Sequence, residues 1–99
     1  LTNERHKGSR VIANTFEIIN KLGLHARAAS VFVKTASAFS AEITVRGTEK
    51  DANGKSIMSM MLLEAAFGST IEVRIEGDDE SAAMTVLATL IENRFGESE

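Results

Sequence analysis

The sequence contains no cysteine and no proline, and it has only two histidines. Without cysteine the chain cannot form a disulfide, an iron–sulfur cluster or a thiolate zinc site, which fits a reducing cytoplasm. With so few histidines, we expect no metal site. No apolar run approaches the roughly 20 residues that a membrane-spanning helix needs, and no signal peptide is visible.

An excess of positive charge is also lacking. The net charge is −3, which argues against a general nucleic-acid-binding protein. The chain has 99 residues, of which 43% are hydrophobic and 25% are charged. These values predict one folded domain with a single core rather than a disordered chain.

The chain divides into three parts by composition. Residues 1–10 are polar and charged, include His6, and are predicted to form a flexible lead-in of little functional weight. Residues 11–95 carry the hydrophobic periodicities of a domain, and residues 96–99 form a short acidic tail.

Within residues 11–54 the periodicity of the apolar residues changes repeatedly. Alternation around Phe16 and Ile18 predicts a strand near 13–19. Apolar residues at Ala29, Phe32, Val33 and Ala36 then predict an amphipathic helix over about 26–38. A β-branched run at 42–46 predicts a second strand, and the polar stretch 47–54 a turn with a weak edge strand.

The second half of the domain continues the alternation. Ser56 is a good N-cap for a short helix, which we expect Gly68 to end. Residues 71–76 alternate strictly and predict the clearest strand. The last helix is predicted to be capped by Asp78 or Asp79. Its expected buried face consists of Ala83, Val86, Leu87, Leu90 and Ile91. The order βαββαβα predicts a two-layer α/β sandwich, with helices on one face of the sheet and water on the other.

The most informative segment is residues 20–28, which read NKLGLHARA. A glycine-containing loop leads into a helix, His25 stands where that helix begins, and Arg27 follows two positions later. Imidazole titrates near neutral pH and is a nucleophile toward phosphorus, while a helix N-terminus favours negative charge. The segment suits a phosphoryl group carried on histidine. The alternative interpretation is that His25 only caps the helix and Arg27 is a solvated surface charge.

This segment resembles the active-site segment of HPr, the histidine-containing phosphocarrier protein of the bacterial phosphotransferase system. The resemblance extends from Val11 to Phe95 and includes five further segments in the expected order and spacing. These are FVK at 32–34 with EITV at 42–45, KSIM at 55–58, GSTI at 68–71 and EGDD at 76–79.

The resemblance implies an open-faced β-sandwich in which three helices cover one face of a four-stranded antiparallel sheet. It further implies that His25 accepts phosphate on its δ nitrogen from phosphorylated enzyme I and passes it to enzyme IIA domains. Arg27 would interact with that phosphate. The protein would be a monomeric cytoplasmic carrier rather than an enzyme, with no cofactor and no nucleic-acid or membrane partner.

One position departs from the family pattern. The family usually has proline directly after the arginine, and here this residue is Ala28. Proline presets the backbone of the first helical turn, so its absence is expected to lose preorganisation of about 0.4–1 kcal/mol. Partner affinity and transfer rate are the properties that this change puts in question.

Ser56 and the helix after it carry a second set of expectations. Ser56 is expected to be an N-cap, and the resemblance adds regulatory phosphorylation by HPr kinase/phosphorylase. The residues after Ser56 are too apolar to fit on one buried helix face, so some of them must be exposed. We expect Met60 and Leu63 to be in the core. By resemblance, the partner-docking surface near His25 includes Ile57, Met58 and Met61, with Lys34 and Lys55 adding positive charge.

Three functional alternatives remain. The carrier could serve sugar transport or the nitrogen-related branch, toward which residues 20–23, 61–66 and the acidic end lean slightly. A regulatory binding module on the same fold is the rival from another class, although relatives of that kind lose the histidine. A hydrolase is the poorest match, because no carboxylate pair or nucleophile triad has a recognisable spacing.

Overall fold

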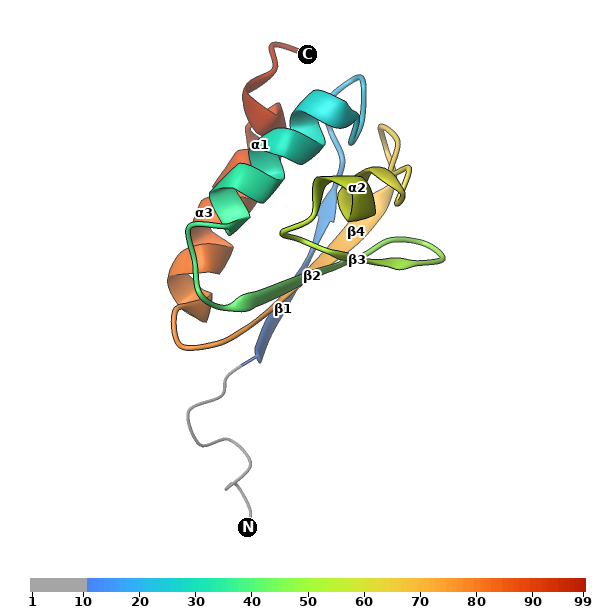
Figure 1. Ribbon diagram of the computed structural model, residues 1–99. Helices are drawn as coiled ribbons and strands as arrows, with labels where there is room; N and C mark the ends of the chain where they lie inside the picture. The colour runs from blue at the N-terminus through green and yellow to red at the C-terminus, as the bar shows by residue number, and fades with distance from the viewer. Residues whose placement is uncertain (1–10) are drawn as a thin grey trace.

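The computed structural model describes residues 11–99, and within this range four strands form one antiparallel sheet (Figure 1). The strands are β1 (Val11–Glu17), β2 (Glu42–Arg46), β3 (Asp51–Asn53) and β4 (Thr70–Glu76). Their spatial order is β1-β4-β2-β3, so the last strand of the chain lies in the middle of the sheet. The lead-in predicted for residues 1–10 lies outside the described residues.

The predicted strands are confirmed with shifted bounds at β1. This strand begins at Val11 rather than at residue 13, because it pairs with the whole of β4, from Val11 opposite Glu76 to Glu17 opposite Thr70. In β4 itself, Ile71, Val73 and Ile75 are buried and the residues between them lie on the other face. The alternation therefore produces a sheet with one apolar face, as expected.

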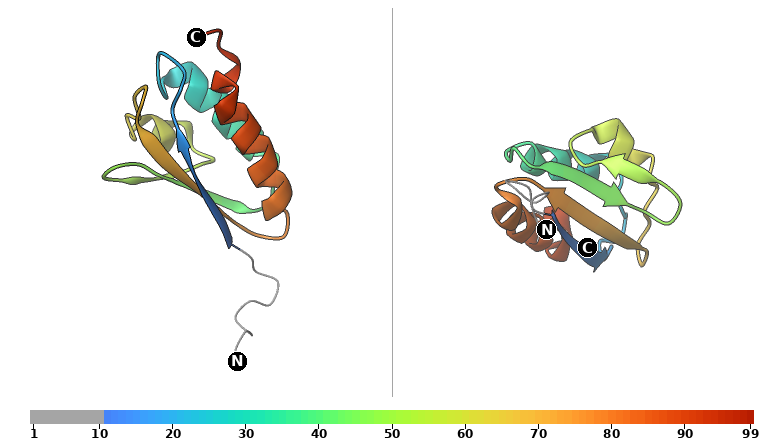
Figure 2. Two further views of the ribbon diagram at one scale, coloured as in Figure 1. Left: turned by 180° about the vertical axis from the view of Figure 1, so that it is seen from behind. Right: turned by 90° about the horizontal axis from the view of Figure 1, so that it is seen from below.

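Three helices cover that apolar face, as the two views in Figure 2 show. They are α1 (Ala26–Ala36), α2 (Ile57–Met61) and α3 (Glu80–Glu92), and a 3-10 turn η2 (Arg94–Gly96) follows α3. The open-faced sandwich with βαββαβα order is therefore confirmed. None of the helices in the described range is long and apolar enough to cross a membrane.

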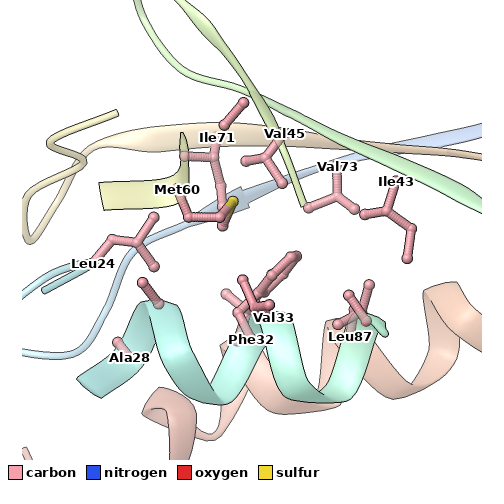
Figure 3. Close-up of a cluster of buried hydrophobic side chains, with 14 of the residues drawn as sticks. Leu24, Ala28, Phe32, Val33, Ile43, Val45, Met60, Ile71, Val73 and Leu87 are labelled. Carbon is pink, nitrogen blue, oxygen red and sulfur yellow. The ribbon is translucent and has the colours of Figure 1, made fainter. Parts of the chain in front are cut away.

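The core lies between the helices and the apolar face of the sheet (Figure 3). Phe32 and Val33 of α1 point toward Val45 and Val73 of the strands, and Met60 of α2 closes the cluster at one end. Burying one such side chain stabilises the fold by about 1.5–3 kcal/mol. All four residues predicted on the inner face of α1 are buried. Met60 is completely buried and Leu63 is partly buried against the core.

The predicted end of α2 was wrong. The helix ends at Met61, far before Gly68, because Glu64 adopts a left-handed backbone with φ 53°. Gly68 instead forms the turn into β4, with φ 88° and its N–H donating to the carbonyl of Ile18 at 2.8 Å.

Two details of α3 also differ from expectation. Asp79 occupies the N-cap position, but its carboxylate makes no capping bond and accepts instead from the N–H groups of Ser40 and Ala41, at 2.8 and 2.9 Å. These bonds, the one from Ser40 foremost, hold the pKa of Asp79 below its usual value. Val86 is 42% exposed and Met84 is buried in its place, because α3 buries the neighbouring stripe of Ala83, Leu87 and Ile91.

Candidate functional site

The loop between β1 and α1 is held in place by the segment that precedes β4. Leu24 donates its N–H to the carbonyl of Ala65 at 2.9 Å, and its side chain is buried. Within the loop, the N–H groups of Gly23 and His25 bond to the carbonyls of Asn20 and Gly23 at 3.0 and 2.9 Å. These hydrogen bonds from the N–H groups of Gly23, Leu24 and His25 fix the path of the loop that leads to α1.

Glycine is required at position 23 for two reasons. Its φ of 71° lies in the left-handed region, which is unfavourable for other residues. In addition, a Cβ atom there would lie 2.8 Å from the carbonyl oxygen of Ala65. The close approach of these two backbones sets the path of the loop and hence the position of His25.

His25 is the N-cap residue of α1 but does not use its side chain as a cap. The first helical hydrogen bond runs from Ala29 N–H to the His25 carbonyl at 2.8 Å. The N–H groups of Ala26, Arg27 and Ala28 precede that bond, as expected for the first turn of a helix. The imidazole therefore makes no capping bond, and the ring beside this positive helix end contacts another partner.

That partner is Glu97, which follows η2. The Nε2 atom of His25 lies 2.5 Å from Oε2 of Glu97, and the two side chains are 30% and 13% exposed. The other carboxylate oxygen accepts from Nδ2 of Asn20 at 3.0 Å. Asn20 is completely buried, and Nδ2 also donates to the carbonyl of Gly23 at 2.7 Å. Both of these partners are acceptors, so the amide of Asn20 must direct its nitrogen toward them.

The environment of Glu97 favours the carboxylate form. Burial alone raises the pKa of Glu97, because it penalises the charged form. The hydrogen bonds from Asn20 and His25, with the nearby charges of His25 and Arg27, outweigh burial and hold the pKa below its usual value. Glu97 is therefore an ionised acceptor at neutral pH.

A surface hollow opens at this point. Figure 1 shows the end of the chain beside the start of α1. The hollow is lined by the loop, the first turn of α1 and the chain end, namely by Lys21, Leu22, His25, Ala26, Arg27, Gly96, Glu97, Ser98 and Glu99. Arg27 is exposed at its wall, and Lys21 forms a solvent-exposed ion pair with Glu99 at 3.5 Å. The hollow therefore holds two cationic side chains, Lys21 and Arg27, and two carboxylates, Glu97 and Glu99.

Lys34 and Lys55 do not line this hollow. Lys34 stands in the last turn of α1, and Lys55 donates from Nζ to the carbonyl of Phe39 at 2.6 Å, just beyond that helix. Both lysines therefore lie toward the end of α1 opposite His25. The cationic side chains that do line the hollow are Lys21 and Arg27.

Ser56 caps α2 as predicted, because its Oγ accepts from the N–H of Ser59 at 3.2 Å. The expected exposure of Ile57, Met58 and Met61 is confirmed, at 42%, 70% and 42%. Leu22, Leu62 and Phe67 are further exposed apolar side chains among the described residues.

Sequence reasoning missed Glu97 as a partner of His25 and treated it only as part of an acidic tail. The two residues are 72 positions apart, and no local pattern connects them. Asn20 was part of the recognised segment, but its bond to Glu97 depends on the same distant contact. Within residues 11–99, no group of three or more His, Cys, Asp or Glu side chains is arranged to hold a metal ion.

Comparison with known proteins gives consistent matches. The family described as "PTS HPr component phosphorylation site" matches residues 12–93. "Phosphocarrier protein HPr" of Neisseria meningitidis is 49% identical over 89 residues, which is 90% of this chain and all of that protein. "Phosphocarrier protein NPr" of Shewanella violacea is 42% identical over 82% of this chain and 89% of its own length. The crystal structure of HPr-C-His from Thermoanaerobacter tengcongensis, 48% identical, matches with a TM-score of 0.84 over 89% of this chain and 99% of that one.

Proposed function

Because the chain belongs to the HPr family of phosphocarrier proteins, we propose that it carries a phosphoryl group on His25. The group would come from phosphorylated enzyme I of the phosphoenolpyruvate-dependent phosphotransferase system and pass to enzyme IIA domains. The observation that carries the proposal is the partly exposed imidazole at the start of α1, in a hollow that Arg27 also lines. The chain would act as a carrier without turnover of its own.

The chemistry needs an accessible nucleophile and donors for three phosphoryl oxygens. His25 supplies the nucleophile at a position that a partner protein can reach. The amides that begin α1 and the guanidinium of Arg27 supply positive charge beside it. With alanine at position 28, the chain also has an amide N–H where the family usually has proline, so Ala28 adds one donor to this helix start.

The docking surface of the proposal is the apolar patch on α2, made of Ile57, Met58 and Met61. Flexible methionine side chains can adapt to several partners, which a carrier shared between enzyme I and enzyme IIA domains requires. Ser56 precedes this patch directly. Its phosphorylation by HPr kinase/phosphorylase would place about −1.5 to −2 charges beside Ile57 and weaken docking.

The test of the carrier function is mass spectrometry after incubation with phosphoenolpyruvate and enzyme I. We expect the wild-type chain to gain the mass of one acid-labile phosphoryl group, and His25→Ala to gain none. Ser56→Ala is the matched control and should still accept phosphate from enzyme I. No uptake by the wild type, or continued uptake by His25→Ala, would contradict the proposal and leave a binding module that acts through docking.

Two further assays address the finer points. Incubation with the enzyme I of the sugar branch and of the nitrogen-related branch separates the two branches by the rate of phosphorylation, since relatives named HPr and NPr both match.

For Ser56, we expect acid-stable phosphorylation that depends on ATP and the kinase and that Ser56→Ala abolishes. A wild-type chain that stays unmodified would reduce Ser56 to a helix cap.

A further inference from the structure

Glu97 reaches the proposed phosphorylation site through a specific turn after α3. Arg94 and Phe95 both adopt left-handed backbone conformations, with φ of 56° and 54°, which are uncommon for residues other than glycine. The Phe95 side chain is 4% exposed and anchors this turn in the core. This turn directs the chain toward the start of α1, where Glu97, two residues after Phe95, contacts His25.

The contact between Glu97 and His25 restricts where the imidazole holds its proton. An ionised carboxylate can only accept hydrogen bonds, and Asn20 fills its other oxygen. At 2.5 Å, the bond to Nε2 therefore requires a proton on that nitrogen. In a neutral ring with a proton on Nε2, the free lone pair is on Nδ1, and only a nitrogen with a free lone pair can attack phosphorus.

We propose that Glu97 is a positioning residue for phosphoryl transfer, which holds the proton of His25 on Nε2 and thereby presents Nδ1 as the nucleophile. This inference rests on the proposed function and names the residue that sets up its reacting atom. Asn20 acts through Glu97, since its amide orients the carboxylate and ties it to the loop at Gly23.

The transfer step balances with these groups alone. Nδ1 forms its bond to phosphorus as the bond from phosphorus to the donor breaks, and the electron pair of that bond leaves with the donor. The ring becomes an imidazolium that keeps its proton on Nε2, facing the carboxylate of Glu97. When the phosphoryl group passes on, the electron pair of the Nδ1–phosphorus bond returns to the ring, which is neutral again.

The other charged groups at the hollow fit this assignment. Lys21 and Arg27 are cationic, and Glu99 is engaged with Lys21. Glu97 is thus the carboxylate that holds the ring, while Arg27 is left on the wall of the hollow where a phosphoryl group would arrive.

The experiment is nitrogen-15 NMR of the imidazole of His25 in the unphosphorylated chain, together with phosphorylation rates from enzyme I. In the wild type at a pH where the ring is neutral, we expect the Nε2–H tautomer. In Glu97→Gln, whose amide can donate as well as accept, we expect a mixture of tautomers and a rate about 10- to 100-fold lower, as for loss of a charge-assisted bond. Glu92→Gln removes one exposed charge at the end of α3 and should change neither result.

Each remaining outcome decides against the proposal. A wild-type ring protonated on Nδ1 would overturn it, even if phosphorylation proceeds and the proposed function stands. An unchanged tautomer and rate in Glu97→Gln would overturn it as well. If the wild-type chain takes up no phosphate, the proposed function fails and this inference fails with it, although the tautomer of the ring would still report the contact with Glu97.

Discussion

Replacing Gly23 with alanine tests whether the close approach of two backbones positions the histidine. The change forces a left-handed conformation on alanine, which costs about 1–2 kcal/mol. Part of this is offset by the lower entropy of the unfolded alanine chain, about 0.4–1 kcal/mol. The new Cβ would also lie 2.8 Å from the carbonyl oxygen of Ala65, which belongs to the backbone and cannot simply rotate away.

Overpacking of this kind costs about 1–3 kcal/mol, so with the net conformational cost we expect Gly23→Ala to lower the free energy of unfolding by about 1–4.5 kcal/mol. Gly68→Ala is the matched control. Gly68 also has a left-handed φ, 88°, but a Cβ there would meet nothing within 4 Å. Only the conformational cost applies, and we expect a loss of about 1 kcal/mol or less.

Urea unfolding followed by circular dichroism measures both losses of stability. In thermal unfolding, each 1 kcal/mol of lost stability would lower Tm by about 4–8 °C. Because the clash displaces the loop that carries His25, phosphorylation by enzyme I should slow in Gly23→Ala and stay near wild type in Gly68→Ala. Equal losses of stability in the two variants would refute the reasoning, since the contact with Ala65 would then have no consequence.

Three further predictions concern the N-cap of α2, the hydrophobic core and the dependence of stability on acidic pH. Ser56→Ala should lower the free energy of unfolding by about 1 kcal/mol through loss of the bond from Ser59, whereas Ser56→Asp, which can still cap, should lose less. Met60→Ala should cost about 2–5 kcal/mol, and Met58→Ala, two residues away but 70% exposed, less than about 0.5 kcal/mol; similar losses would mean that Met60 is not a core residue. Because the folded state lowers the pKa of Glu97 below 4.5, its contribution to stability is present above that pH and is lost as the pH falls through the lower folded value. The stability difference between wild type and Glu97→Gln should therefore shrink as the pH falls from 5 to below the folded value, and a difference that grows on acidification would contradict this assignment.

Local pattern predicted most of the elements because their causes are local. The apolar spacing of Ala29, Phe32 and Val33 is a property of one helix, and the alternation at residues 71–76 is a property of one strand. The predictions of burial failed where tertiary contacts decide which side chains are covered. Val86 has the right spacing for the buried face of α3 but is exposed, because packing against the sheet selected the stripe that includes Met84.

Charge placement shows the same limit. Lys34 and Lys55 belong to recognised segments, but Lys34 lies in the last turn of α1 and Lys55 bonds to Phe39 just beyond it, so both are at the end of α1 opposite His25. Asp79 was a reasonable helix cap by position, yet its carboxylate bonds to the N–H groups of Ser40 and Ala41 on another connection. A side chain with several partners within reach binds the ones that the fold brings closest, and a sequence pattern does not report them.

By itself, the sequence determined that a histidine followed by an arginine stands at a helix start after a glycine loop, within a βαββαβα domain. It did so because turns, caps and periodicities act over a few residues. Only the tertiary structure decided what faces the ring. The contact of His25 with Glu97 spans 72 positions and exists because β1, α1 and the turn after α3 meet at one end of the sandwich. The motif thus specified the reacting residue, and the fold brought to it the carboxylate that we propose selects the reacting nitrogen.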